Sequence, residues 1–282
     1  MTAEVFDSRN CSLGEGPMWH PLRNQLFWFD INNKKMLSRN EGKPLEWQFD
    51  EHVSAAGWVS EGEMLIASES QLFLFDLGTG ASDHICPLEA DNPITRSNDG
   101  RADPWGGFWI GTMGKQAEAQ AGSIYRFYKG ELVKLYGAIT ISNAICFSPD
   151  KRFAYFTDTP TRQIMRQPLD AEGWPDGAAE VFIDLNSEGL NPDGAVVDAE
   201  GCLWSAQWGA SRVARYSPDG MFLSAATFPT EQISCPAFGG ADGATLFVTS
   251  ANESIATPSA AQGRTYQALL TTKGQTEHQV VL

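Results

Sequence analysis

Six short apolar runs of similar character recur along the 282 residues, and they restrict the possible folds more than any other feature. Each run is rich in aromatic or β-branched residues, which suit the pleated, half-buried surface of a strand. The runs occupy residues 26–30 (LFWFD), 64–68 (MLIAS), 108–112 (FWIGT), 154–158 (AYFTD), 203–207 (LWSAQ) and 246–250 (LFVTS). Their first residues lie 38, 44, 46, 49 and 43 positions apart. A period of this length indicates one structural unit repeated six times.

Turn residues and further short strands surround each run. Pro, Asp, Asn or Gly precede most runs, as in residues 148–151 (SPDK) and 198–201 (DAEG), and these residue types favour tight turns. Other strand-like stretches lie before the turns and after the runs, and four strands in about 40–50 residues are typical of a propeller blade. We therefore predict an all-β, six-bladed β-propeller of four-stranded antiparallel blades, a single domain over residues 1–282. A large β-sandwich is the alternative, but it does not require such a regular repeat.

Charge and cysteine content limit the partners and the compartment. The formal net charge of −15 predicts repulsion from nucleic acids and from anionic membranes. The first residues show neither the basic nor the apolar segment of a secretory signal, and no apolar run approaches the roughly 20 residues that span a bilayer. Five scattered cysteines without a C-x-x-C motif predict buried free thiols. We expect a cytoplasmic protein, monomeric or weakly oligomeric, that binds neither nucleic acid nor membranes.

The repeat also brings polar residues together. In a propeller the first strand of each blade lines the central channel, so corresponding positions of the six blades form a ring. The residues just before these inner strands are, in order, Glu15, the pair Ala55 and Ala56, Asn98, Asn143, Asp193 and Pro236. Carboxylate and amide oxygens suit hard divalent cations. Four oxygen-bearing side chains therefore predict a metal site at one channel mouth, unless Asn and Asp only cap turns there.

These residues lie in motifs that resemble the gluconolactonase/regucalcin (senescence marker protein) family of sugar lactonases. The motifs are residues 13–19 (LGEGPMW), 96–100 (RSNDG) with 108–113 (FWIGTM), 141–143 (ISN) with 148–150 (SPD), and 192–194 (PDG). They occur in the family's order and extend over nearly the whole chain. The chain departs from the family pattern at Ala144, where Gly is frequent, and at Ser97, which is a variable position that is often larger.

The resemblance implies one divalent metal ion bound by Glu15, Asn143 and Asp193. It also implies that the protein hydrolyses an aldonolactone, which is a cyclic sugar-acid ester. Arg96 and Asn98 would bind this substrate. Within such a site Asp193 is our candidate general base, because a carboxylate beside a metal can accept a proton from the attacking water. We expect Ca²⁺, with Zn²⁺, Mg²⁺, Mn²⁺ and Fe²⁺ as alternatives. The competing functions are a non-catalytic calcium-binding regulatory protein of the regucalcin type and a scaffold for protein partners.

Three further features are possible parts of the site. Trp19 and Trp58 could stack on a sugar ring near the mouth, although packing between blades is the commoner role. His52, just before the second inner strand, is a weaker candidate for a substrate contact. Residues 114–122 (GKQAEAQAG) either cover the site or form a plain surface loop.

Overall fold

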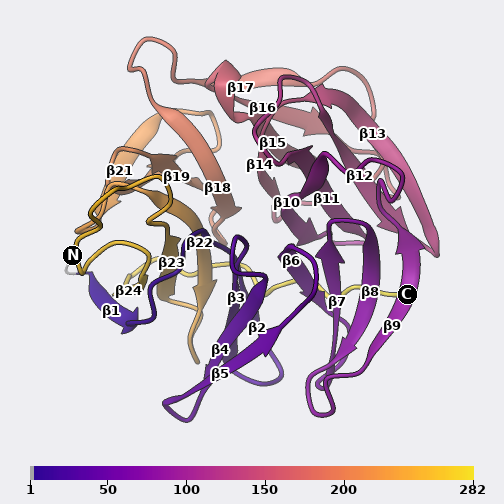
Figure 1. Ribbon diagram of the computed structural model, residues 1–282. Coiled ribbons are helices and arrows are strands. Elements are labelled where there is room, and N and C mark those ends of the chain that lie inside the picture. The colour runs from indigo at the N-terminus through magenta and orange to yellow at the C-terminus, as the bar shows by residue number, and fades with distance from the viewer. Residues whose placement is uncertain (1–2) are drawn as a thin grey trace.

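Six four-stranded antiparallel sheets surround a central channel in the computed structural model, which describes residues 3–282 (Figure 1). Blade 1 contains β2 (Gly14–His20), β3 (Gln25–Asp30), β4 (Lys35–Asn40) and β5 (Lys43–Gln48). Blade 2 contains β6 (Val53–Trp58), β7 (Glu63–Ser68), β8 (Gln71–Asp76) and β9 (Ser82–Pro87). Blade 3 contains β10 (Thr95–Ala102), β11 (Phe108–Gly114), β12 (Gly122–Tyr128) and β13 (Glu131–Ile139). The predicted propeller is confirmed.

The fourth and fifth blades follow the same order from the channel outward. Blade 4 contains β14 (Ser142–Phe147), β15 (Phe153–Asp158), β16 (Gln163–Pro168) and β17 (Glu180–Asp184). Blade 5 contains β18 (Asn191–Val197), β19 (Leu203–Trp208), β20 (Arg212–Tyr216) and β21 (Phe222–Thr227). Between residues 3 and 282 the only helical element is the 3₁₀ turn η1 (Thr159–Thr161), so no helix there is long and apolar enough to cross a membrane.

The sixth blade combines both ends of the chain. Its strands β22 (Ile233–Gly239), β23 (Thr245–Ser250) and β24 (Thr265–Leu269) are joined by β1 (Glu4–Asp7), which pairs with β24 as the outermost strand. Backbone hydrogen bonds between the first and last strands therefore close the ring. The repeat alone did not predict this closure, because β1 lies outside the sixfold pattern.

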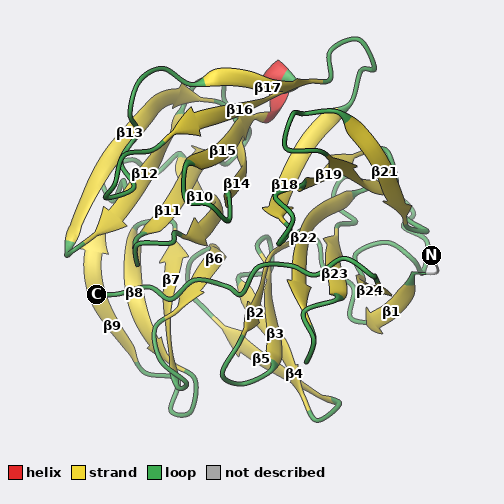
Figure 2. Cartoon of the chain, turned by 180° about the vertical axis from the view of Figure 1, so that it is seen from behind, coloured by secondary structure: helices red, strands yellow, loops and turns green. Residues whose placement is uncertain are grey.

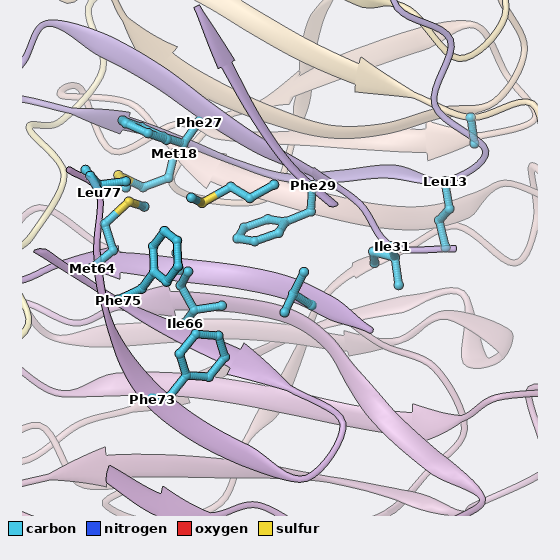
Figure 3. Close-up of a cluster of buried hydrophobic side chains, with 14 residues drawn as sticks. Leu13, Met18, Phe27, Phe29, Ile31, Met64, Ile66, Phe73, Phe75 and Leu77 are labelled. Atoms are coloured by element: carbon cyan, nitrogen blue, oxygen red, sulfur yellow. The ribbon is translucent and has the colours of Figure 1, made fainter. Parts of the chain in front are cut away.

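The six apolar runs all lie in the second strand of their blade, as predicted. These strands are largely buried on both faces because each blade packs between two neighbours. Figure 3 shows one such interface, where Phe27 and Phe29 of β3 pack with Met64 and Ile66 of β7 in a single apolar cluster. Packing of this kind fixes the blades relative to one another and so holds the inner strands in place.

Each inner strand contains a shift in register near its start. The shifts fall between Glu15 and Met18, Val53 and Ala55, Ser97 and Gly100, Asn143 and Cys146, Pro192 and Ala195, and Ile233 and Pro236. A β-bulge bends the strand and re-aims the side chains beside it. The predicted site residues thus lie inside the inner strands at these irregularities, and their placement just before the strands was wrong.

The segment after β24 crosses one end of the channel, as Figure 2 shows from behind. Its backbone hydrogen bonds join Lys273 to Ala199, Val280 to Trp58 and Val281 to Gly106. The Gln275 side chain donates to the carbonyl oxygens of Phe147 and Val197 at 2.9 and 3.0 Å. Phe147 and Val197 are the last residues of their inner strands, so this segment covers the end of the channel opposite the strand starts.

Candidate active site and metal centre

The starts of the inner strands surround a cavity of about 690 Å³ at the other mouth of the channel. All five predicted site residues line it: Glu15, Arg96, Asn98, Asn143 and Asp193. They come from β2, β10, β14 and β18, and therefore from four different blades. The volume lies within the range of roughly 300–1,000 Å³ found for small-molecule sites. Residues far apart in the sequence thus meet in one cavity of suitable size.

Glu15 and Asp193 are almost completely buried. Glu15 is followed by Gly16, which has a φ of +53° and lies so close to the Ser54 carbonyl oxygen that any Cβ there would collide with it. Burial, and after it the charge of Asp99, raises the pKa of Glu15 to about 8. Burial, and after it the charge of Glu15, raises the pKa of Asp193 well above its usual value. The two carboxylates therefore repel each other.

Arg96, Asn98 and Asn143 are joined by hydrogen bonds. Arg96 Nη1 donates to Asn98 Oδ1 at 2.7 Å, and Asn98 Nδ2 donates to Asn143 Oδ1 at 3.2 Å and to the Ser142 carbonyl at 2.8 Å. Asn143 Nδ2 in turn donates to Thr159 Oγ1 at 2.9 Å, which fixes the orientation of this amide. Because both N–H groups of the Asn98 amide are used, Asn98 offers the cavity only acceptor capacity.

The oxygen donors of Glu15, Asn143 and Asp193 fit a hard divalent cation. Neither carboxylate forms an ion pair with any residue of the described chain, although the charge of Arg96 acts on Glu15 from a distance. Two carboxylates balance the charge of a divalent ion, and such an ion would remove the repulsion between them. These three residues could therefore hold one metal ion and leave further coordination positions for other ligands.

Asp99 is a third buried carboxylate; it does not line the cavity but follows Asn98, which does, and the sequence pattern alone did not single it out. It accepts a hydrogen bond from the backbone N–H of Ile145 at 2.7 Å, and burial raises its pKa to about 6. Its charge contributes to the raised pKa values of both Glu15 and Asp193. The available signal was its place beside Asn98, inside the RSNDG motif.

Other residues that line the cavity were also missed. Trp208 is the last residue of β19, and Glu253 follows β23 and accepts a hydrogen bond from Asn32 Nδ2 at 3.0 Å. Lys115, together with residues 116 and 117, forms another part of the lining, so the segment 114–122 borders the site. Their common signal was position, because each lies at the end of the second strand of its blade or within the few residues after it.

Trp19 and Trp58 do not line the cavity, so of their two interpretations stacking on a sugar ring is wrong. Both lie near the ends of their inner strands, on the far side of the channel. Trp19 stacks on Phe247 with ring centroids 5.4 Å apart, and Trp58 Nε1 donates to the Glu277 carbonyl oxygen at 2.9 Å. The commoner role, packing within the fold, is confirmed for both residues.

A second group of possible metal ligands, Asp198, Glu200 and Cys202, lies between β18 and β19. Asp198 accepts hydrogen bonds from the backbone N–H groups of Glu200 and Cys202, each at 2.9 Å. Arg215 forms ion pairs with both carboxylates at 2.8 and 2.7 Å. These contacts already supply the group with a cation, and they indicate a stabilised turn instead of a metal site.

Residues 13–252 match the family described as the SMP-30/gluconolactonase/LRE-like region. This chain belongs to that family. The matched region contains all five predicted site residues, so the resemblance in the short motifs extends to blades 1–5 and to β22 and β23 of blade 6.

Three relatives show how far the similarity reaches. A Rhizobium meliloti (strain 1021) protein with the provisional name sugar lactone lactonase is 40% identical over 274 residues, which cover 94% of this chain and 92% of the relative. The Pseudomonas putida 6-deoxy-6-sulfogluconolactonase is 35% identical over 245 residues, covering 86% and 84%. The crystal structure of a regucalcin from Agrobacterium tumefaciens strain C58, described as a calcium-binding protein, is 41% identical, with a TM-score of 0.96 and coverage of 100% and 98%.

Proposed function

We propose that this protein is a lactonase that hydrolyses the cyclic ester of a sugar acid and requires one divalent metal ion, held by Glu15, Asn143 and Asp193. The observation that carries the proposal is the pair of buried carboxylates, which form no ion pair within the described part of the chain, in a cavity of small-molecule size. Burying like charges is costly, so a cation-binding role accounts for their presence. The lactonase names of several relatives support the substrate class.

Hydrolysis of a lactone requires a polarised carbonyl, a base for the attacking water and contacts to the sugar hydroxyls. When bound, the metal supplies a Lewis acid for the carbonyl and for the developing oxyanion. Asp193 accepts the proton of the attacking water. Arg96 donates to carbonyl or hydroxyl oxygens of the substrate, and Asn98 accepts a hydrogen bond from one hydroxyl. Ca²⁺ is the expected ion, with Zn²⁺, Mg²⁺, Mn²⁺ and Fe²⁺ as alternatives.

A second candidate function is calcium binding without turnover. The relatives include proteins named regucalcin, and the Agrobacterium regucalcin structure is described as that of a calcium-binding protein. The same three oxygen-donor residues would serve this function. The two candidates therefore differ in whether any lactone is hydrolysed.

The test is hydrolysis of a panel of γ- and δ-aldonolactones, monitored by pH-stat titration before and after chelation. We expect at least one lactone to be hydrolysed, the activity to disappear with chelator, and one of the divalent ions to restore it. Glu46→Gln, at an exposed position, is the matched control for Glu15→Gln. Turnover that survives both chelation and Glu15→Gln would contradict the metal role, whereas metal binding without turnover of any lactone would favour the second function.

A further inference from the structure

A connected cluster of three polar residues, His52, Glu69 and Lys115, borders the cavity on the side of blades 2 and 3. His52 precedes β6, Glu69 lies between β7 and β8, and Lys115 follows β11. One carboxylate oxygen of Glu69 accepts from His52 through both its backbone N–H, at 3.1 Å, and its Nδ1. The other oxygen accepts from Lys115 Nζ. His52 and Lys115 line the cavity, whereas Glu69 supports them from behind.

The protonation states in this cluster follow from its contacts. Burial alone would raise the pKa of Glu69, but hydrogen bonds from Lys115 and His52 hold it at about 2, so Glu69 is ionised. Burial lowers the pKa of His52 despite the nearby carboxylate, so the imidazole is neutral at pH 7. A neutral imidazole beside an ionised carboxylate carries its proton on Nδ1, which leaves Nε2 as an acceptor.

The unused hydrogen-bonding capacity of the cluster consists of one donor and one acceptor. Lys115 Nζ has three N–H donors, of which one goes to Glu69 and one to the Pro93 carbonyl at 3.0 Å. Within residues 3–282 neither the third donor nor His52 Nε2 has a partner. A hydroxyl group is both donor and acceptor, so it can satisfy these two groups at once, whereas a carboxylate or sulfonate can only accept.

The cluster is separate from the proposed reacting end of the cavity. Glu15 and Asp193 come from β2 and β18, in blades 1 and 5. The charge of Arg96 acts on both Glu15 and His52, whereas the largest effects on the pKa of His52 come from burial, Glu69, Arg96 and Lys34. A substrate whose carbonyl lies at the carboxylates would therefore extend past Arg96 toward His52 and Lys115.

We propose that His52 Nε2 and Lys115 Nζ together bind one hydroxyl of the substrate remote from the ester carbonyl, and that they determine which polyhydroxylated lactones are accepted. The inference rests on the proposed lactonase function. Glu69 is the positioning residue of this pair, because it contacts both side chains and does not line the cavity.

The test combines protein variants with substrates that each lack one hydroxyl. The kcat/KM values of the wild-type protein, Lys115→Met and His52→Phe are measured on the best aldonolactone and on its monodeoxy analogues. We expect each variant to lose about 10- to 100-fold on the parent lactone, as for a lost hydrogen bond at a polar binding site. For one deoxy analogue the kcat/KM values of the variants should equal that of the wild type, because this analogue lacks the hydroxyl that the two residues bind. Lys43→Met, at an exposed position, is the matched control.

Three outcomes would overturn the inference, and each is distinguishable from the others. If each variant lost the same factor in kcat/KM on the parent lactone and on every deoxy analogue, His52 and Lys115 would not recognise one particular hydroxyl. A larger loss on a lactone with an anionic terminal group would assign the cluster to an anion. A wild-type protein that hydrolyses no lactone would remove the proposed function itself. Melting temperatures of the metal-loaded variants within a few degrees of the wild type establish that the losses are not caused by unfolding.

Discussion

The two ends of the central channel handle buried charge in opposite ways. At the open mouth, Glu15 and Asp193 are buried with Asp99 nearby, and no cationic group of residues 3–282 is in ion-pair contact with them, so their pKa values rise. At the closed end, the Arg101 side chain is largely buried, with 11% of its surface exposed, and it pairs with Glu277 of the C-terminal segment. Burial alone would lower the pKa of Arg101, yet Glu277 holds it above its usual value.

This difference separates a structural arrangement from a functional one. A buried pair of opposite charges is internally balanced, and its loss harms folding. A buried pair of like charges contributes repulsion, which an additional cation would relieve. The like charges at the open mouth are therefore expected to destabilise the fold when no cation is bound and to favour cation binding. The ion pair at the closed end stabilises the fold without a ligand.

The largest expected effect is that of Asp193→Asn, which removes one charge while keeping the shape of the side chain. We expect kcat/KM on the best lactone to fall by about 10³-fold or more, because both the base and a metal ligand are lost. The melting temperature of the chelator-treated protein should rise, since the repulsion with Glu15 disappears. Lactone titration and thermal unfolding of the same preparation check both parts. A lower melting temperature would show that the carboxylate stabilises the metal-free fold.

Glu277→Gln at the closed end should show the opposite pattern. The free energy of unfolding should fall by about 3 kcal/mol, because the largely buried Arg101 loses its ion-pair partner. Activity per folded molecule should stay within about twofold, since neither residue lines the cavity. Denaturant unfolding and active-site-normalised rates measure these quantities, and Arg101→Met combined with Glu277→Leu should recover much of the lost stability. A loss of activity without a loss of stability would contradict the structural role.

A moderate pH effect should distinguish the metal-free from the metal-loaded protein. The folded pKa of Glu15 is about 8, above the 4.5 of an ordinary glutamate, so the folded protein retains a proton that the unfolded chain releases between these values. The stability of the metal-free protein should therefore fall as the pH rises from about 4.5 to 8. Because a metal binds the deprotonated carboxylates, the stabilisation it provides should grow over the same range. Melting curves with and without chelator at pH 5 and 8.5 test this, and a pH-independent difference would contradict it.

The smallest expected effect concerns the backbone beside the ligand Asn143. Ala144 has a φ of +58°, a left-handed conformation that favours glycine. Ala144→Gly should relieve about 1–2 kcal/mol of backbone strain but lose the burial of one methyl group, about 0.8 kcal/mol. We expect a slight net stabilisation and unchanged kcat/KM. Ala154→Gly, a buried strand alanine without positive φ, should only destabilise.

The sequence by itself determined the repeated strands, the ring of site residues and the family motifs. The six second strands were predictable because each run alone has the residue types of a doubly buried strand, and the repeat fixed their number. The ring of Glu15, Asn98, Asn143 and Asp193 was predictable because equivalent positions in a closed repeat must converge. The motifs around these residues indicated the family.

Only the tertiary structure decided which neighbours those residues have. Asp99, the Lys115–Glu69–His52 cluster and the Arg101–Glu277 pair join segments from different blades or from the C-terminal segment, and no local pattern encodes such contacts. The bulges determine which side chains enter the cavity, and strand polarity places Trp19 and Trp58 at the opposite end. Burial and the distance between charges set the pKa values, and these exist only after the blades have closed around the channel.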